Sequence, residues 1–259
     1  MTIFAHHSLL FITSVLMITG FFAGMVDTIS GGGGLIALPM LIGLGLPITT
    51  AIGTNRLQGI IGELVALFRF IVGYKVLDLS KITWALVVIA ISASLGALVV
   101  MRIHPDILNK CIPFLLLAIL LYIVFRPQLG RKDIQQRISP IWFYGLFAVV
   151  IGFYNGFFGP GTGSFWVFAL MYCLGLNQQR ATIQMKPLNL VGNVASILWF
   201  IFASKVDYVA VLAMAVGQIF AAYFSTYLVV SKGYKVIRPL FIVIVAVMTI
   251  DLFVKNFFV

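Results

Sequence analysis

The 259-residue chain is 62% hydrophobic and only 9% charged, and it carries a formal net charge of +10. So few charged side chains exclude a soluble domain of this length, which needs more of them to cover its surface. Uncharged apolar stretches at 9–26, 82–101 and 209–230 reach or approach the ~20 residues that cross a ~30 Å hydrocarbon core. They are too long for the strands of a membrane barrel, so the sequence predicts an all-α polytopic membrane protein.

Taken in chain order, the apolar segments form two series of five. We expect helices at about 6–28, 33–46, 49–73, 80–102 and 106–126, then at about 140–157, 162–176, 179–203, 207–230 and 235–256. The second and seventh are short enough to be half-helices behind a re-entrant break, which gives about eight to ten crossings. The longest polar stretch, 127–139, separates a first transmembrane repeat, 1–126, from a second, 140–259.

The clearest internal signal is a duplicated motif. The segment 20–63 returns in altered form at 152–193, and each copy opens with Gly-Phe-x-x-Gly, breaks into a glycine-rich run and resumes with an apolar segment ending in Leu-Gly-Leu. After that point a constant offset of 130 residues relates the copies and brings Arg56 onto Lys186. Interrupted hydrophobic segments at corresponding places in two halves are the best sequence indication of a transporter's binding site.

An odd number of elements in each half would insert the second half upside down, giving two inverted repeats with interrupted helices at the glycine-rich motifs. Cytoplasmic loops are enriched in Lys and Arg, so basic residues indicate the orientation. One side would carry Lys75, Lys81, Arg126, Arg131, Lys132, Arg137, Arg180, Lys232, Lys235 and Arg238, and the other Arg102, Lys110, Lys205 and Lys255. This bias predicts a cytoplasmic 127–139 linker and two periplasmic termini, and it explains the positive charge without a nucleic-acid partner.

Of the basic residues, Arg56, Arg69 and Lys186 remain within predicted helices, and of the acidic residues Asp27 and Glu63 also lie well inside. A charge at mid-bilayer costs at least ~2.5–3.5 kcal/mol on insertion scales, so such residues usually face the protein interior and serve function. As repeat mates, Arg56 and Lys186 would suit a desolvated anion on a central axis. The structural alternative pairs Arg56 with Glu63, seven residues further along the same face, or with Asp27. Arg69 lies near a helix end, where snorkelling to the interface is the favoured role.

The glycine-rich runs have two interpretations. Backbone without a Cβ can approach a ligand closely, and the N–H groups at the start of the next half-helix attract anions. Alternatively, glycines of the Gly20/Gly24 and Gly152/Gly156 type pack helices together. With the nearby amides, the runs complete a candidate substrate-binding set: Ser30, Gly31, Gly32, Gly33, Asn55, Arg56, Gln58, Gly161, Thr162, Gly163, Ser164, Lys186, Asn189 and Asn193.

The two carboxyl groups are candidates for proton coupling, because they would stand beside the path of the anion. Asp27 precedes the first break, where capping of the following half-helix is the preferred alternative. For Glu63 the preferred alternative is an ion pair with Arg56. Cys111 and Cys173 show no disulfide or metal spacing, and neither a paired-carboxylate, His-cluster or Ser/His/Asp set nor a nucleotide motif is present. We therefore expect no enzyme activity, cofactor or metal.

The stretch GFFAGMVDTISGGGGLIALP, followed by GLPITTAIGTNRLQ, resembles the first motif of the TauE/SafE family, the sulfite exporter type of anion transporter. GFYNGFFGPGTGSFWVFALMYCLGLNQQRATIQMKPLNLVGNVAS resembles its second motif, and the GTNRLQ and KPLN details are similar to the YfcA-like branch. The resemblance covers essentially the whole chain. It implies secondary transport of sulfur-containing or small organic anions such as sulfite, sulfonates or thiosulfate. The glycine runs depart from the usual GxGGG pattern where a substrate would bind.

We therefore predict a secondary transporter of small anions in the bacterial inner membrane, working by alternating access between the two repeats. Its partners would be the small anion and membrane lipid. An anion channel would share every motif but would conduct without saturation or counterflow. A membrane assembly factor that acts on a partner protein is the alternative from another class.

Overall fold

The computed structural model describes residues 9–73, 82–104, 107, 114, 117 and 135–231, and the regular structure among them is helical. The helices are α1 (Leu9–Ser30), α2 (Gly34–Gly43), α3 (Ile48–Phe68, extended by the π-helical turn Arg69–Gly73), α4 (Thr83–Arg102), α6 (Pro140–Phe157), α7 (Thr162–Cys173), α8 (Gln178–Phe202) and α9 (Tyr208–Ser231). The predicted helices 106–126 and 235–256 and most of the 127–139 linker lie outside the described residues, apart from helical positions 107, 114 and 117.

Five of the described helices, α1, α4, α6, α8 and α9, are long and apolar enough to cross a membrane. The apolar helices α2 and α7 are shorter, as predicted for half-helices. α3 has 21 residues, more than α4 or α6, and buries several polar side chains. The chain is thus a multi-pass membrane protein built on helices.

Both predicted helix breaks are present. The first separates α1 from α2 between Ser30 and Gly34, and the second separates α6 from α7 between Phe157 and Thr162. Gly31 and Gly161 turn the chain with φ angles of 69° and 81°, in the left-handed region that residues with a Cβ rarely adopt. Glycine is therefore required at these turns.

The half-helices end earlier than the hydrophobic pattern predicts. α2 ends at Gly43 rather than near position 46, and α7 ends at Cys173 rather than near position 176. Within the two Leu-Gly-Leu motifs, Gly45 and Gly175 adopt φ angles of 85° and 73°. A left-handed glycine terminates a helix, so the same motif stops both half-helices.

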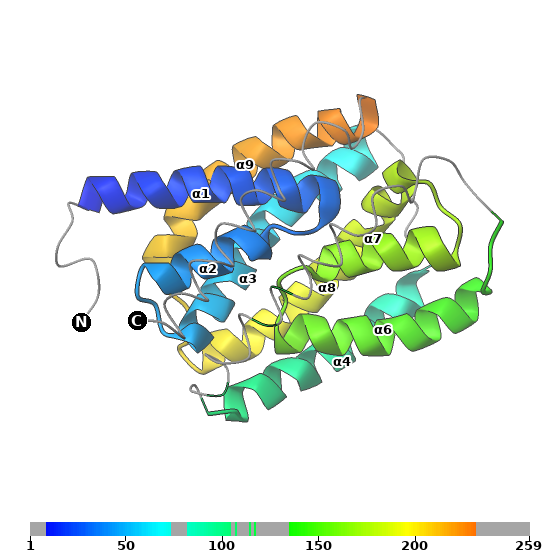
Figure 1. Cartoon of the computed structure of the whole chain (residues 1–259), viewed down its shortest axis with the longest axis horizontal. Coiled ribbons are helices and arrows are strands. Elements are labelled where there is room, and N and C mark those ends of the chain that lie inside the picture. The colour runs from blue at the N-terminus through cyan, green and yellow to red at the C-terminus, as the bar shows by residue number, and fades with distance from the viewer. Residues whose placement is uncertain are drawn as a thin grey trace.

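The helices pack in corresponding pairs. α1 packs along α9 and α6 packs along α4, while α3 contacts both α8 and α9, and α8 also contacts α4. Figure 1 shows α1 with α9 along one edge and α4 with α6 along the other, with α2, α3, α7 and α8 between them. The central elements are therefore the half-helices and the two polar helices that follow them.

Glycines allow the outer pairs to approach closely. A Cβ on Gly20 would lie 2.2 Å from the Met214 carbonyl oxygen of α9, and one on Gly156 would lie 1.7 Å from the Ala93 carbonyl oxygen of α4. Real Cβ atoms do not approach so near, so a larger residue would separate the helices. The packing interpretation of the Gly-Phe-x-x-Gly motifs is confirmed at both sites.

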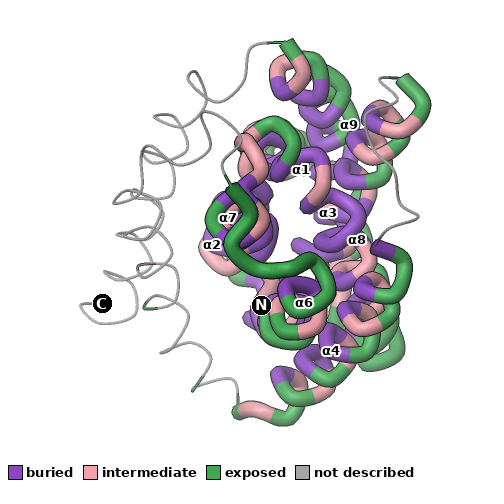
Figure 2. Tube along the Cα trace, turned by 90° about the vertical axis from the view of Figure 1, so that its right-hand side faces the viewer, coloured by how far each residue is buried: buried purple, intermediate pink, exposed green. Residues whose placement is uncertain are grey.

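Burial follows the membrane environment. Figure 2 shows buried segments facing the interior and exposed ones on the outer sides of the helices, with α3 largely buried. Many exposed side chains are large and apolar, including Trp142 on α6 and Phe220 on α9. An apolar outer surface suits lipid contact, and the polar residues of α3 and α8 instead gather inside.

Candidate functional site

The two helix breaks meet in the interior. A Cβ on Gly31 would lie 2.3 Å from the Cα of Gly163, so the two backbones touch. Ser164 Oγ donates to the Ser30 carbonyl oxygen at 2.7 Å, which joins the start of α7 to the end of α1. Gly163, Ser164 and Ser30 thus connect the two breaks, and the cavity lies beside them.

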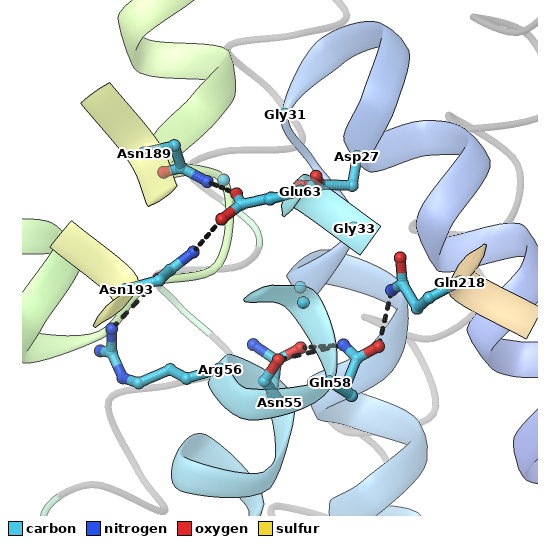
Figure 3. Close-up of a pocket in the computed structure, with 14 residues that line it drawn as sticks. Asp27, Gly31, Gly33, Asn55, Arg56, Gln58, Glu63, Asn189, Asn193 and Gln218 are labelled. Carbon is cyan, nitrogen blue, oxygen red and sulfur yellow. Dashed lines mark hydrogen bonds between the residues drawn. The ribbon is translucent and has the colours of Figure 1, made fainter. Parts of the chain in front are cut away.

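Beside this contact lies a polar cavity of about 30 Å³, enough for about two or three water molecules or one small ion. It is drawn in Figure 3, where side chains from α1, α3, α8 and α9 converge. The cavity is lined by Asp27, Gly31, Gly33, Gly34, Asn55, Arg56, Gln58, Gly59, Glu63, Gly159, Gly161, Asn189, Asn193 and Gln218.

Ten of the sixteen predicted substrate-binding and proton-coupling residues line this cavity. The ten are Asp27, Gly31, Gly33, Asn55, Arg56, Gln58, Glu63, Gly161, Asn189 and Asn193. The remaining six, Ser30, Gly32, Thr162, Gly163, Ser164 and Lys186, are not among the lining residues.

Arg56, on α3, is 2% exposed and reaches the end of α6. Its Nη2 donates to the carbonyl oxygens of Asn155 and Gly156 at 2.5 and 2.8 Å. Its Nη1 donates to Ser196 Oγ at 2.9 Å, and the guanidinium lies 5.3 Å from the ring centre of Phe200. The carbonyl end of a helix is partly negative, which stabilises the buried cation.

No carboxylate in the described part of the chain lies within 4 Å of the Arg56 guanidinium. The predicted direct pair with Glu63 or Asp27 is therefore absent. Arg56 and Glu63 share a face of α3, but asparagines from α6 and α8 lie between them, and the guanidinium turns to the α6 carbonyl groups instead. The Arg56 guanidinium is therefore hydrogen-bonded to neutral acceptors.

Lys186, the repeat mate of Arg56, is completely buried on α8. Its Nζ donates to the Asp27 carboxylate at 2.8 Å and to the Asp27 carbonyl oxygen at 2.6 Å. Lys186 therefore forms an ion pair with Asp27. Asp27 does not cap α2 as expected, because the cap residue Gly33 receives no side-chain hydrogen bond and the Asp27 carboxylate is used by Lys186.

The two cations make reciprocal contacts between the halves. Arg56 extends from α3 to the last turn of α6, and Lys186 extends from α8 to the last turn of α1. Each therefore binds the carbonyl end of the helix just before the other half's break. Arg56 and Lys186 thus occupy equivalent positions in the two repeats, and their side chains make equivalent contacts.

Glu63 accepts hydrogen bonds from two asparagines of α8. Asn189 Nδ2 donates to Glu63 Oε1, and Asn193 Nδ2 donates to Oε2 at 3.0 Å. Asn189 Oδ1 in turn accepts from Asn155 Nδ2 at 3.3 Å, and Asn155 Oδ1 accepts from Arg56 Nη1 at 3.1 Å. Glu63 is 1% exposed, so this network replaces water around its carboxylate.

A second polar chain crosses the cavity from α3 to α9. Gln58 Nε2 donates to Asn55 Oδ1 at 3.1 Å, and Gln58 Oε1 accepts from Gln218 Nε2 at 2.6 Å. Gln218 Oε1 occupies space that a Cβ on Gly24 or Gly62 would fill, at 2.6 and 2.3 Å. These glycines make room for the Gln218 amide beside the cavity.

Sequence reasoning missed Gln218 and Asn155. Each is an amide within an apolar helix, and that rarity is the signal that would have found them.

Arg69 is predicted to snorkel to the interface, and in the structure its guanidinium lies 3.7 Å from the ring centre of Tyr223 on α9. Among the described residues, no group of three His, Cys, Asp or Glu side chains could hold a metal ion.

The starts of α2 and α7 both face the cavity through Gly33, Gly34 and Gly161. The first N–H groups of a helix have no acceptor within that helix, and they carry its partial positive charge. With Arg56 and the amides, the cavity offers donors suited to an anion, while Glu63 and Asp27 supply carboxylates beside it.

The family model described as sulfite exporter TauE/SafE matches residues 16–252. The chain belongs to the TauE/SafE family. This confirms the resemblance carried by the two glycine-rich motifs. Because the match spans α1 to α9, the cavity lies within the family-defining part of the chain.

Relatives in the TauE/SafE family carry transporter names. A "Probable membrane transporter protein" of Haemophilus influenzae is 37% identical over 236 residues, covering 91% of this chain and 92% of the relative. "Probable membrane transporter protein YfcA" of Escherichia coli K12 is 37% identical over 238 residues, covering 92% and 88%. A Sinorhizobium relative, "Probable membrane transporter protein ORF9", is 35% identical over 237 residues, covering 92% and 90%. No solved structure matches the chain significantly.

Proposed function

We propose that this protein is a secondary transporter of small anions, sulfur-containing ones such as sulfite, thiosulfate or sulfonates in particular, across the bacterial inner membrane. The observation that carries the proposal is the position of Arg56. It is a buried cation without a carboxylate partner in the described structure, and it lines a small cavity between the starts of two half-helices. The name of the TauE/SafE family supports the sulfur anion class.

The proposed mechanism is alternating access between two inverted repeats. Its support is the matching set of helix contacts: α1 with α9 corresponds to α6 with α4, and α3 with α9 corresponds to α8 with α4. The cavity lies at the junction of the halves, where one repeat rocking against the other would open it to each side in turn. The proposed topology has a cytoplasmic linker and periplasmic termini.

Arg56 would bind the anion directly, assisted by the Asn55 amide and the starts of α2 and α7. Lys186 would act indirectly, because its ammonium group is bound to Asp27 and Lys186 itself does not line the cavity. The cavity, of about 30 Å³, would suit a small, largely dehydrated ion. A larger sulfonate would require the cavity to widen as the repeats move.

Flux in liposomes tests the proposal. Purified protein is reconstituted, and the flux of sulfite, thiosulfate, sulfoacetate, taurine and acetate is measured for the parent and for Arg56→Gln. Arg180→Gln, at an exposed position on α8, is the matched control for loss of an arginine. Saturable flux with counterflow, lost in Arg56→Gln and kept in Arg180→Gln, is the expected result.

Two other outcomes contradict parts of the proposal. Flux that neither saturates nor shows counterflow indicates an anion channel. Normal flux in a well-folded Arg56→Gln protein removes Arg56 from the site and leaves the half-helix starts as its centre. If no anion in the panel moves, the small-anion assignment is wrong.

A further inference from the structure

The hydrogen bonds around Glu63 form a closed ring. From Arg56 one path passes through Asn155 and Asn189, and a second passes through Asn193 alone. Both paths end on the Glu63 carboxylate, one on each oxygen. The ring therefore joins a buried cation to a buried carboxylate through three neutral amides.

The direction of these bonds bears on the charge of Glu63 in this conformation. Every amide in the ring presents its oxygen toward Arg56 and its NH₂ group toward Glu63, so both carboxyl oxygens act as acceptors. An ionised carboxyl group only accepts, whereas a protonated one must donate through one oxygen. This conformation thus suits an ionised Glu63 better than a protonated one.

Charge balance then couples Glu63 to anything negative in the cavity. Among the described residues, four charged groups face this region: Asp27 from α1, Arg56 and Glu63 from α3, and Lys186 from α8. The other titratable group that faces it from a neighbouring helix, Tyr154 of α6, donates to the Pro160 carbonyl oxygen. With all four ionised, the sum is zero.

An anion entering the cavity would leave this buried region with a net negative charge. It would lie in a space of about 30 Å³ that the Glu63 carboxylate also lines, and like charges at such short range repel strongly where little water screens them. A proton taken up together with the anion cancels one negative charge. It restores the sum to zero for a monovalent anion and reduces the excess to −1 for a divalent one such as thiosulfate. The second question is which carboxylate accepts it.

The contacts favour Glu63 over Asp27. The Asp27 carboxylate lies 2.8 Å from the Lys186 ammonium, and protonating it would leave that buried cation without its counter-charge. Glu63 has no cation within 4 Å in the described structure, and its neighbours are amides that can rotate to accept from a carboxylic acid. Protonation of Glu63 therefore disrupts fewer favourable contacts than protonation of Asp27.

We propose that Glu63 is the proton-carrying group and that one proton and one anion occupy the site together and cross in the same direction. This rests on the proposed function. The proton comes from the solution on the side from which the anion enters, binds one Glu63 carboxylate oxygen, and is released to the opposite side when the anion leaves. No bond other than this O–H bond forms or breaks.

The first test measures proton uptake on binding. Thiosulfate is the probe, because it remains fully ionised near neutral pH, whereas sulfite itself titrates there and would obscure the count. Calorimetric titration of the full-length protein in buffers of different ionisation enthalpy gives the protons taken up per anion. We expect about one for the parent and about zero for Glu63→Gln, whose neutral amide resembles the protonated acid. By reciprocal linkage, parent affinity rises as pH falls, while Glu63→Gln affinity does not change with pH.

The second test measures flux in liposomes with a proton gradient and no thiosulfate gradient. We expect the gradient to drive net thiosulfate accumulation by the parent protein and none by Glu63→Gln, which should still show thiosulfate counterflow. Arg180→Gln, at an exposed position on α8, is the comparison variant and should keep proton uptake on binding.

The outcomes separate this inference from the proposed function. Thiosulfate binding and counterflow without proton uptake in the parent overturn the coupling and leave the transporter intact. Proton uptake that persists in Glu63→Gln overturns the assignment to Glu63 and indicates Asp27. If no anion of the panel binds or moves, the proposed function itself fails.

Discussion

The ammonium group of Lys186 on α8 binds Asp27 on α1 twice, at 2.8 Å through the carboxylate and at 2.6 Å through the main-chain carbonyl. Lys186 is completely buried, so no water replaces either contact. The pair holds the end of α1 to the centre of α8, next to the first helix break. Asp27 lines the cavity and Lys186 does not, so the pair supports the cavity wall from within the protein.

Lys186→Met should destabilise the protein strongly, because it leaves Asp27 as a buried charge without a partner. Loss of one member of a buried pair typically costs ~3–5 kcal/mol. Thermal unfolding in detergent of Lys186→Met, Asp27→Asn and the double variant forms a complete cycle. We expect the double variant to be more stable than the sum of the single losses allows. Additive losses would show that the two side chains are not energetically coupled.

Arg56→Lys should not substitute for arginine. The guanidinium donates through two nitrogens to carbonyl groups of α6 and to Ser196 of α8, and a single ammonium group cannot reach the same acceptors. We expect anion flux to fall at least about tenfold, together with a stability loss of ~1–3 kcal/mol from unpaired acceptors. Unchanged flux and melting temperature would show that charge alone is sufficient at this position.

Gly156→Ala should separate α6 from α4. The added Cβ would lie 1.7 Å from the Ala93 carbonyl oxygen, which is main chain and cannot rotate away. We expect a loss of ~1–3 kcal/mol in unfolding free energy. Gly145→Ala is the control on the same helix, because its Cβ would meet nothing within 4 Å, and it should raise stability by ~0.5–1 kcal/mol. Equal melting temperatures for the two variants would contradict the packing argument.

Gln218→Leu should weaken anion binding with little change in fold. The substitution removes the donor to Gln58 Oε1 and replaces a polar wall of the cavity with an apolar one. A buried acceptor left unpaired costs ~1–3 kcal/mol, and the part of this cost that falls on the anion-bound state raises Kd, by about 5-fold for each 1 kcal/mol. Titration with thiosulfate measures the change, with Gln179→Leu as a control at an exposed amide. A Kd equal to that of the parent would remove Gln218 from the binding site.

Much of the fold follows from local sequence. The helix breaks are predictable because glycine turns at Gly31 and Gly161 need a left-handed backbone, and Pro160 removes a donor between α6 and α7. The burial of Arg56 and Lys186 is predictable from the repeat, because each lies at the same position in the helix that follows a break. The ends of α2 and α7 depend on Gly45 and Gly175, whose conformation hydropathy does not report.

The partners of the buried charges could not be predicted in the same way. Spacing along α3 places Arg56 and Glu63 on one face, but which groups fill the space between them depends on how α6 and α8 pack against α3. Asn155, from α6, enters the notch left by Gly192 and separates the pair. Such contacts join residues far apart in sequence, and a single sequence contains no record of them.

The reciprocal contacts of the two cations have a consequence for biogenesis. When α1 first enters the membrane, Asp27 has no counter-charge, since Lys186 follows 159 positions later. Arg56 likewise precedes the α6 carbonyl groups that receive it by about a hundred residues, as its 100-residue separation from Gly156 shows. The first half is therefore synthesised before the groups that bind Asp27 and Arg56 in the folded protein, and their final contacts can form only after the second half is made.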